Sequence, residues 1–152
     1  MKRILLLLVA MFATVTSFAQ KADTLAIKQT INLMFDAMRK GDSTSLKSTF
    51  AKGMILQSVS TGKDGKVVLS TDSADDFAKA IAAPHTSVYD ERIVFSDIKI
   101  DGDLASVWAP YKFYLGDKFN HCGVDVFQLM RTADGWKIIY IVDTRRKDNC
   151  VE

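Results

Sequence analysis

Four long segments rich in β-branched and aromatic residues dominate the second half of this 152-residue chain. They run over residues 89–100, 104–115, 119–131 and 136–145, and they are separated by the turn sequences IDGD, LGDK and TADG. This pattern predicts an antiparallel meander whose strands are long for a small domain, so the sheet must coil. Pro110 lies inside one segment and predicts a bulge or a sheet edge, because proline donates no backbone hydrogen bond.

Helical periodicity precedes the meander. The apolar residues of the first predicted helix recur at intervals of three and four, as Ile27, Ile31, Met34, Phe35 and Met38. Asp23 is the expected N-cap, and Gly41 is the expected left-handed stop. Asp42 or Ser43 is expected to begin a short second helix that ends at Gly53.

A hairpin and a third helix complete the first half. Residues 54–60 predict a strand, and the KDGK sequence after it is a tight turn that leads into a partner strand. Ser73 and Asp76 form a capping box that predicts the start of a third helix. The order of helix, helix, hairpin, helix and meander predicts one α+β domain over residues 20–152, with helices on one face of a curved antiparallel sheet.

Residues 1–19 predict a cleaved secretory signal peptide. Two cations precede an apolar run, and small residues occupy Ser17 and Ala19, which are the −3 and −1 positions for cleavage after Ala19. The alternative is a membrane anchor, but the apolar run has about 10 residues and a spanning helix needs ~20. We therefore expect a periplasmic or secreted protein with no membrane anchor after cleavage.

The charge balance excludes a protein that binds polyanions through a basic field. The chain has 20 Lys and Arg residues against 18 Asp and Glu residues, and the leader removes two cations and no acid, which leaves 18 of each. Such a neutral chain has no positive field to attract nucleic acid or anionic lipid. Asp143 with Arg145 or Arg146 is interpreted as a solvated ion pair at a strand end, which contributes little stability. The alternative is that these residues form an anion-binding site.

Both cysteines, Cys122 and Cys150, lie in the part of the chain that is predicted to be exported. An oxidising compartment permits a disulfide between them, and closing this loop would contribute about 3 kcal/mol in the chain-entropy model. The alternative is two free thiols, because the sequence does not supply the Cα separation that a disulfide requires. The spacing does not match a zinc site. Neither a metal nor a cofactor is expected.

The order of elements, with HCGVDVFQL at residues 121–129 and GWKIIYIVDTRR at residues 135–146, resembles the nuclear transport factor 2-like superfamily. The resemblance covers residues 22–146 and looks like the lumazine-binding-like branch, beside SnoaL-like cyclases and ketosteroid isomerases. It implies a cone in which the curved sheet wraps a pocket under the first helix, often in a homodimer formed through sheet surfaces. Superfamily members include isomerases, hydratases and non-catalytic binders, so the fold implies no single reaction.

The register of the last hairpin determines which side chains face the predicted pocket. With Arg131 opposite Trp136, one face carries His121, Gly123, Asp125, Phe127, Leu129, Ile138, Tyr140, Val142, Thr144 and Arg146. A bulged turn would instead shift the pairing by one residue and mix the two faces, because strand faces alternate. We take the unshifted register as the prediction.

This face contains the candidate site. The candidate ligand-binding residues, including aromatic residues of the preceding strand, are His121, Asp125, Phe127, Tyr140, Trp108 and Tyr111. In a pocket of low dielectric constant the pKa of a carboxyl group rises, so Asp125 could act as an acid or a base near neutrality, as could His121. The alternative is a structural hydrogen-bonded pair of His121 and Asp125 near the sheet edge.

The segment DVFQL also resembles the ketosteroid isomerase pattern, in which an acid on this strand donates a hydrogen bond to a ligand oxygen. Asp125 occupies the matching position, but the first helix offers Asp36 and no tyrosine. The leading hypothesis is therefore an exported domain that binds a small, partly apolar molecule. The alternatives are an acid–base enzyme of the isomerase or cyclase type that uses Asp125 and His121, and a dimeric module whose sheet face binds a protein.

Overall fold

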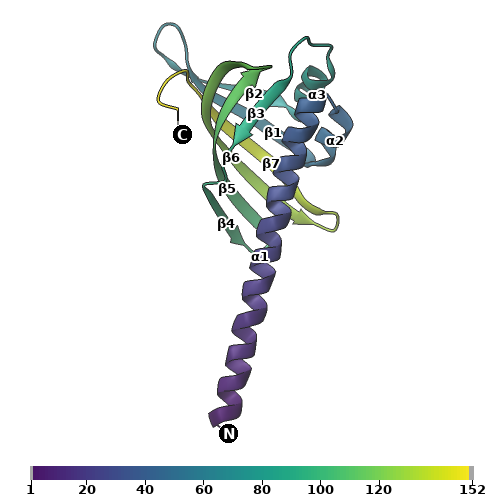
Figure 1. Cartoon of the computed structure of the whole chain (residues 1–152), viewed down its shortest axis with the longest axis vertical. Coiled ribbons are helices and arrows are strands. Elements are labelled where there is room, and N and C mark those ends of the chain that lie inside the picture. Colours follow the sequence, from purple (N-terminus) through teal and green to yellow (C-terminus); the bar gives the residue numbers. More distant parts are fainter. Residues whose placement is uncertain (1, 151–152) are drawn as a thin grey trace.

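The structure, a computed structural model, describes residues 2–150, and the side chains it describes are those of residues 20–150. The elements are α1 (Lys2–Lys40), α2 (Ser43–Ser48), β1 (Phe50–Thr61), β2 (Val67–Ser73), α3 (Ala74–Ala82), β3 (Tyr89–Ile93), β4 (Asp97–Asp101), β5 (Leu104–Leu115), β6 (Lys118–Thr132) and β7 (Gly135–Arg145). The helices pack on one curved, open sheet, which confirms the predicted α+β class (Figure 1). No helix in the described part of the chain is long and apolar enough to cross a membrane.

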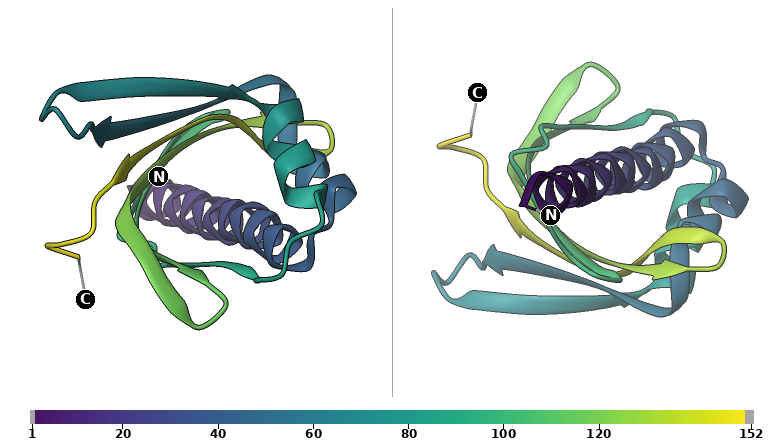
Figure 2. Two further views of the ribbon diagram at one scale, coloured as in Figure 1. Left: turned by 90° about the horizontal axis from the view of Figure 1, so that it is seen from above. Right: turned by 90° about the horizontal axis from the view of Figure 1, so that it is seen from below.

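The sheet has the strand order β2-β1-β7-β6-β5-β3, and β4 also pairs with β5. Neighbouring strands are antiparallel except β1 and β7, which are parallel. The single strand predicted over residues 89–100 is wrong, because Val94–Ser96 divides it into β3 and β4, which pair with successive parts of β5. Figure 2 shows the sheet curving around α1, which lies in its concavity.

The apolar face of α1 forms the core against the concave side of the sheet. Ile27 and Ile31 are fully buried, and the Phe35 ring packs edge-on against Phe127 with 6.1 Å between ring centroids. The predicted N-cap at Asp23 is wrong, because α1 continues through it. The Asp23 carboxylate instead accepts two hydrogen bonds of 2.6 Å from Arg131, which ties α1 to the β6–β7 hairpin.

The caps of the two short helices follow from local sequence. Asp42 caps α2 by accepting hydrogen bonds from the backbone N–H groups of Thr44 and Ser45, and Ser73 caps α3 as predicted. The predicted end of α2 at Gly53 is wrong, because α2 ends at Ser48 and Gly53 lies within β1. Its φ of +80° accompanies an irregularity in the pairing of β1 with β7, so this glycine marks a bulge.

A bulge in β7 changes the predicted register of the last hairpin. Arg131 lies opposite Trp136 as predicted, and Leu129 lies opposite Ile138, but Gln128 lies opposite Tyr140. One extra residue, Ile139, is therefore inserted on the β7 side. Because strand faces alternate, every β7 side chain beyond it lies on the face opposite to the predicted one.

Cys122 and Cys150 form a disulfide with a Cα–Cα separation of 5.7 Å. The bond fastens the chain after β7 to β6. Beside it, the backbone groups of Cys122 and Arg146 exchange two hydrogen bonds of 2.8 and 2.9 Å. Of the two alternatives left open by the sequence, the structure contains the disulfide.

Loss of this disulfide should destabilise the protein by about 3 kcal/mol, because the unfolded chain loses a loop constraint spanning 28 residues. Urea unfolding of the wild type with and without reductant measures the effect. The variant Cys150→Ser should match the reduced wild type and should not respond to reductant. Equal unfolding midpoints for the oxidised and reduced wild type would contradict the prediction.

Candidate functional site

A cavity of about 320 Å³ lies between the helices and the concave face of the sheet. Its apolar wall comes from α1, α3 and the sheet, and includes Met34, Phe35, Met38, Phe77, Ile81, Phe113, Phe127 and Ile141. Its polar end is built on the strands and includes Glu91, His121, Asp125, Asp143 and Arg145. An apolar wall with a few converging polar groups is typical of a small-molecule site, and this volume lies at the lower end of the usual range of about 300–1,000 Å³.

Three carboxyl groups meet at the polar end. Asp125 on β6 lies directly opposite Asp143 on β7, and these residues are only 4% and 6% exposed. Glu91 on β3 comes from the other side of β5, and its carboxyl group lies within reach of a hydrogen bond with that of Asp125. Such a bond requires a shared proton, since two carboxylates cannot donate to one another.

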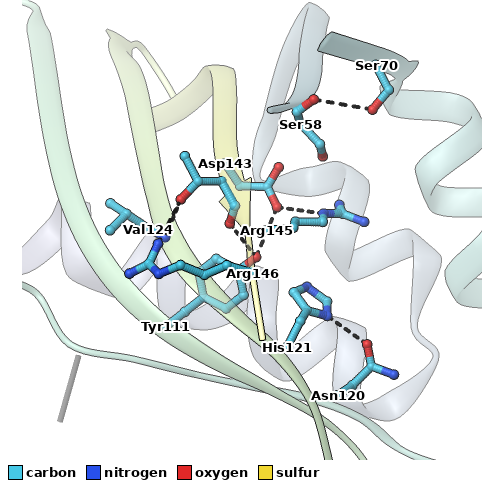
Figure 3. A network of polar contacts seen from close by, with 10 residues as sticks. Ser58, Ser70, Tyr111, Asn120, His121, Val124, Asp143, Arg145 and Arg146 are labelled. Carbon is cyan, nitrogen blue, oxygen red and sulfur yellow. Dashed lines mark hydrogen bonds and ion pairs between the residues drawn. The ribbon is translucent and has the colours of Figure 1, made fainter. Parts of the chain in front are cut away.

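Asp143 has two polar neighbours, shown in Figure 3. The Arg145 Nε donates a hydrogen bond of 2.8 Å to Asp143 Oδ2. The Tyr111 hydroxyl lies 3.1 Å from the same oxygen and 3.0 Å from the Thr144 carbonyl oxygen, and donates to one of them at a time. The expected ion pair of Asp143 with Arg145 is therefore present, but the carboxylate is buried and not solvated as predicted.

Burial shifts the pKa values of this cluster. It raises the pKa of Asp125 well above its ordinary value, and the charges of Glu91 and Asp143 raise it further. Burial also raises the pKa of Glu91 to about 7. Because the two groups are neighbours and titrate together, both retain protons at a higher pH than free carboxyl groups do. Burial and then the Asp143 charge raise the pKa of Tyr111, so its hydroxyl stays protonated.

His121 occupies the edge of the cluster and is neutral at physiological pH. Burial lowers the pKa of its imidazole, and the charge of Arg145 lowers it further. Its Nδ1 lies 2.7 Å from Asn120 Oδ1, so Nδ1 carries the proton and donates to the amide oxygen (Figure 3). The imidazole also packs against the rings of Tyr111 and Phe113.

Two buried oxygen atoms of the cluster have no hydrogen-bond partner among the residues that the structure describes. They are Asp125 Oδ2 and Asp143 Oδ1, and both residues line the cavity. Leaving a buried polar atom unpaired costs about 1–3 kcal/mol, so the protein carries this cost twice at one place. In the described part of the chain, no group of three or more His, Cys, Asp or Glu side chains is arranged to hold a metal ion.

The structure brings together only some of the predicted site residues. His121, Asp125 and Phe127 line the cavity, and Tyr111 is buried beside Asp143. Tyr140 does not line it, because the bulge at Ile139 turns it to the outer face, where its hydroxyl donates to Gln57 Oε1. Trp108 also lies on the outer face, with 51% of its surface exposed, because it alternates with inward-facing neighbours.

The expected pairing of His121 with Asp125 is replaced by two other contacts, His121 with Asn120 and Asp125 with Glu91. Sequence reasoning missed Glu91 because it lies in YDERI, a short charged segment whose composition is typical of an exposed strand. The register of β3 against β5, which places Glu91 opposite Phe113, is the observation that identifies it.

The cone of a curved sheet around α1 is that of nuclear transport factor 2-like proteins. An NTF2-like protein of unknown function from Shewanella baltica is 17% identical, with a TM-score of 0.63 over 84% of this chain and 96% of that chain. One from Novosphingobium aromaticivorans, described as having a cystatin-like fold, is 11% identical, with a TM-score of 0.68 over 87% of each chain. These similarities define the fold class.

The family is more specific than the fold class. Residues 22–142 match the model of the family described as "Putative lumazine-binding", and the chain belongs to that family. A comparison with curated protein sequences finds no match. The predicted superfamily and branch are therefore confirmed.

The buried carboxyl pair should make stability depend on pH. Because the pKa values of Asp125 and Glu91 are raised by folding, the folded protein holds more protons than the unfolded chain between about pH 5 and pH 8, and these groups lower the unfolding free energy as pH rises. The variant Asp125→Asn should therefore gain stability relative to wild type across this range, by on the order of 2 kcal/mol.

Urea unfolding at pH 5, 6.5 and 8 measures this difference, and His121, whose lowered pKa acts in the opposite direction, is common to both proteins. The control Asp101→Asn changes an exposed acid at the end of β4 and should show a difference that does not vary with pH. A constant difference for Asp125→Asn would show that Asp125 is ionised throughout this range.

Proposed function

We propose that this protein binds a small, partly apolar organic molecule in the cavity under α1. The observation that supports this most directly is the two unpartnered buried oxygens of Asp125 and Asp143 at the end of an apolar cavity. A bound molecule with a polar end would satisfy these atoms, while its apolar body would be removed from water by Phe127 and its neighbours. The family description names lumazine, a fused-ring compound with N–H groups, which belongs among the compounds to test.

Filling the cavity mouth should abolish binding. Ala80 lies on α3, lines the cavity and is exposed, so Ala80→Trp places a large ring there without disturbing the core. Saturation-transfer NMR with indole, a small apolar ring with one N–H donor, should give a signal for wild type and none for this variant. The matched control Ala82→Trp changes an exposed residue of the same helix that does not line the cavity, and should bind indole like wild type.

Absence of an indole signal in wild type, together with native mass spectra that show no bound small molecule, would overturn the proposal. Equal signals from the Ala80→Trp and Ala82→Trp variants would place binding elsewhere on the molecule. Thermal unfolding of both variants checks that the fold is intact.

Proton transfer is the second candidate function, as an enzyme of the isomerase or cyclase type. Glu91, whose pKa is raised by burial to about 7, has the titration range of a general acid or base at neutral pH. The predicted pair was Asp125 with His121, but the titrating neighbour of Asp125 is Glu91, so Glu91 takes the place of His121 in this candidate. Recovery of a chemically changed ligand after incubation would favour the enzyme over the binder.

We also propose that the mature protein begins at Gln20 and acts in the periplasm or outside the cell. The leader pattern of residues 1–19 supports this, as does the Cys122–Cys150 disulfide, because oxidising compartments favour such bonds. The homodimer implied by the superfamily also stays a prediction. The outer face of the sheet, with exposed Trp108 and Met130, is the surface that it would use.

Intact mass spectrometry of the protein expressed with its leader in an exporting bacterium should give the mass of residues 20–152. A bulky residue at the −1 position blocks signal peptidase, so Ala19→Leu should leave the leader attached. The control Ala22→Leu lies beyond the cleavage site and should be processed normally. A full-length mass for the wild type would contradict cleavage.

A further inference from the structure

Both unpartnered atoms at the polar end of the cavity are hydrogen-bond acceptors. Asp143 Oδ2 accepts a hydrogen bond from Arg145 and lies beside the Tyr111 hydroxyl, whereas Asp143 Oδ1 and Asp125 Oδ2 have no hydrogen-bond partner among the described residues. Asp125 and Asp143 are paired across neighbouring strands, so the free oxygens belong to adjacent positions of one rigid sheet. The group that is missing from this site is therefore a donor with at least two hydrogens.

The charges around the cavity also favour a positively charged ligand. The titratable and charged groups that face it are Asp72 from β2, Asp76 from α3, Glu91 from β3, Tyr111 beside it from β5, His121 and Asp125 from β6, and Asp143 and Arg145 from β7. The α1 wall is apolar. Among the described lining residues, five carry carboxyl groups and one carries a permanent positive charge. Asp76 has its own partner in Lys79, but the buried acids share only Arg145.

An anionic ligand would meet carboxyl groups in this site, and a neutral carbonyl compound would offer one more acceptor to two acceptors. A positively charged N–H group would supply both the missing donors and the missing charge. We propose that the cavity selects organic monocations, with an apolar body against Phe127 and an amine or amidinium head that donates to Asp125 and Asp143. This inference rests on the proposed function, because it names the ligand class of the same cavity.

Binding of such a cation should release a proton. Glu91 and Asp125 retain protons at a higher pH than free carboxyl groups do, and a cation at the same place competes with these protons. Affinity should therefore rise as the pH increases from 5.5 to 7.5. His121 loses positive charge as the pH rises, which also favours a cation, while Tyr111 stays protonated and Arg145 stays charged, so these neighbours do not reverse the trend.

Three probes of one shape and different charge test the selectivity: benzamidine is a cation, benzamide is neutral, and benzoate is an anion. Isothermal titration at pH 7.5 should show benzamidine binding at least about tenfold more tightly than benzamide, and benzoate binding more weakly still. The benzamidine affinity should fall by about tenfold at pH 5.5, because the pair then keeps its proton. Titrations in two buffers with different ionisation enthalpies should show proton release.

Variants assign the selectivity to the carboxyl pair. Asp125→Asn should bind benzamidine no better than benzamide, and Glu91→Gln, which changes the partner group and leaves Asp125 in place, should remove most of the pH dependence. The control Asp101→Asn, far along the sheet at the exposed end of β4, should leave all three affinities unchanged. Retention of benzamide binding shows that a variant still has its cavity.

The results separate the two proposals. If benzoate or benzamide binds as tightly as benzamidine, or if Asp125→Asn keeps the preference, the cation selectivity is wrong while ligand binding in the cavity stands. If none of the three probes binds and indole gives no signal, both proposals are wrong.

Discussion

One extra residue in β7 determines which side chains enter the cavity. Before Ile139 the hairpin follows the register set by its turn, and beyond it the inward face of β7 carries Ile141, Asp143 and Arg145 in place of Tyr140 and Val142. Without the bulge, Asp125 would lie opposite a valine, and the site would contain Asp125 and Glu91 without Asp143. The carboxyl cluster, the ion pair and the unpartnered oxygens all depend on this irregularity.

Burial of the carboxyl cluster lowers the free energy of unfolding, and the packing of the rest of the fold offsets this loss. Unpaired buried oxygens cost about 1–3 kcal/mol each, against a typical net stability of about 5–15 kcal/mol for a whole domain. The apolar face of α1, held at one end by the Asp23–Arg131 ion pair, covers the sheet next to the cavity. A core that needed only stability would contain apolar residues at positions 125 and 143, so packing does not explain the acids, and their burial supports the proposed binding site.

The sequence predicts those features that depend on local physics. Helical periodicity identifies the buried face of α1, the Ser73 capping box identifies the start of α3, and turn residues identify the hairpins. It does not predict the parallel pairing of β1 with β7, the division of residues 89–100 into two strands, or the bulge at Ile139. These features depend on how the whole sheet coils. The alternation of apolar and polar residues along a strand does not show where an extra residue is inserted. Asp125 was therefore found from the sequence, whereas Glu91 and the position of Asp143 were not.

Close packing of the strands and the disulfide hold the side chains of the cluster in fixed positions. A Cβ on Gly123 would collide with the Thr144 carbonyl group and the Tyr111 ring, so only glycine at this position lets β7 and Tyr111 approach closely enough to hold Asp143. The neighbouring Cys122 is tied by its disulfide to the chain just beyond β7, which holds the same strands together from the other side. Side chains fixed in this way cannot relax to satisfy one another. The buried acids therefore keep the positions on which the proposed binding site depends.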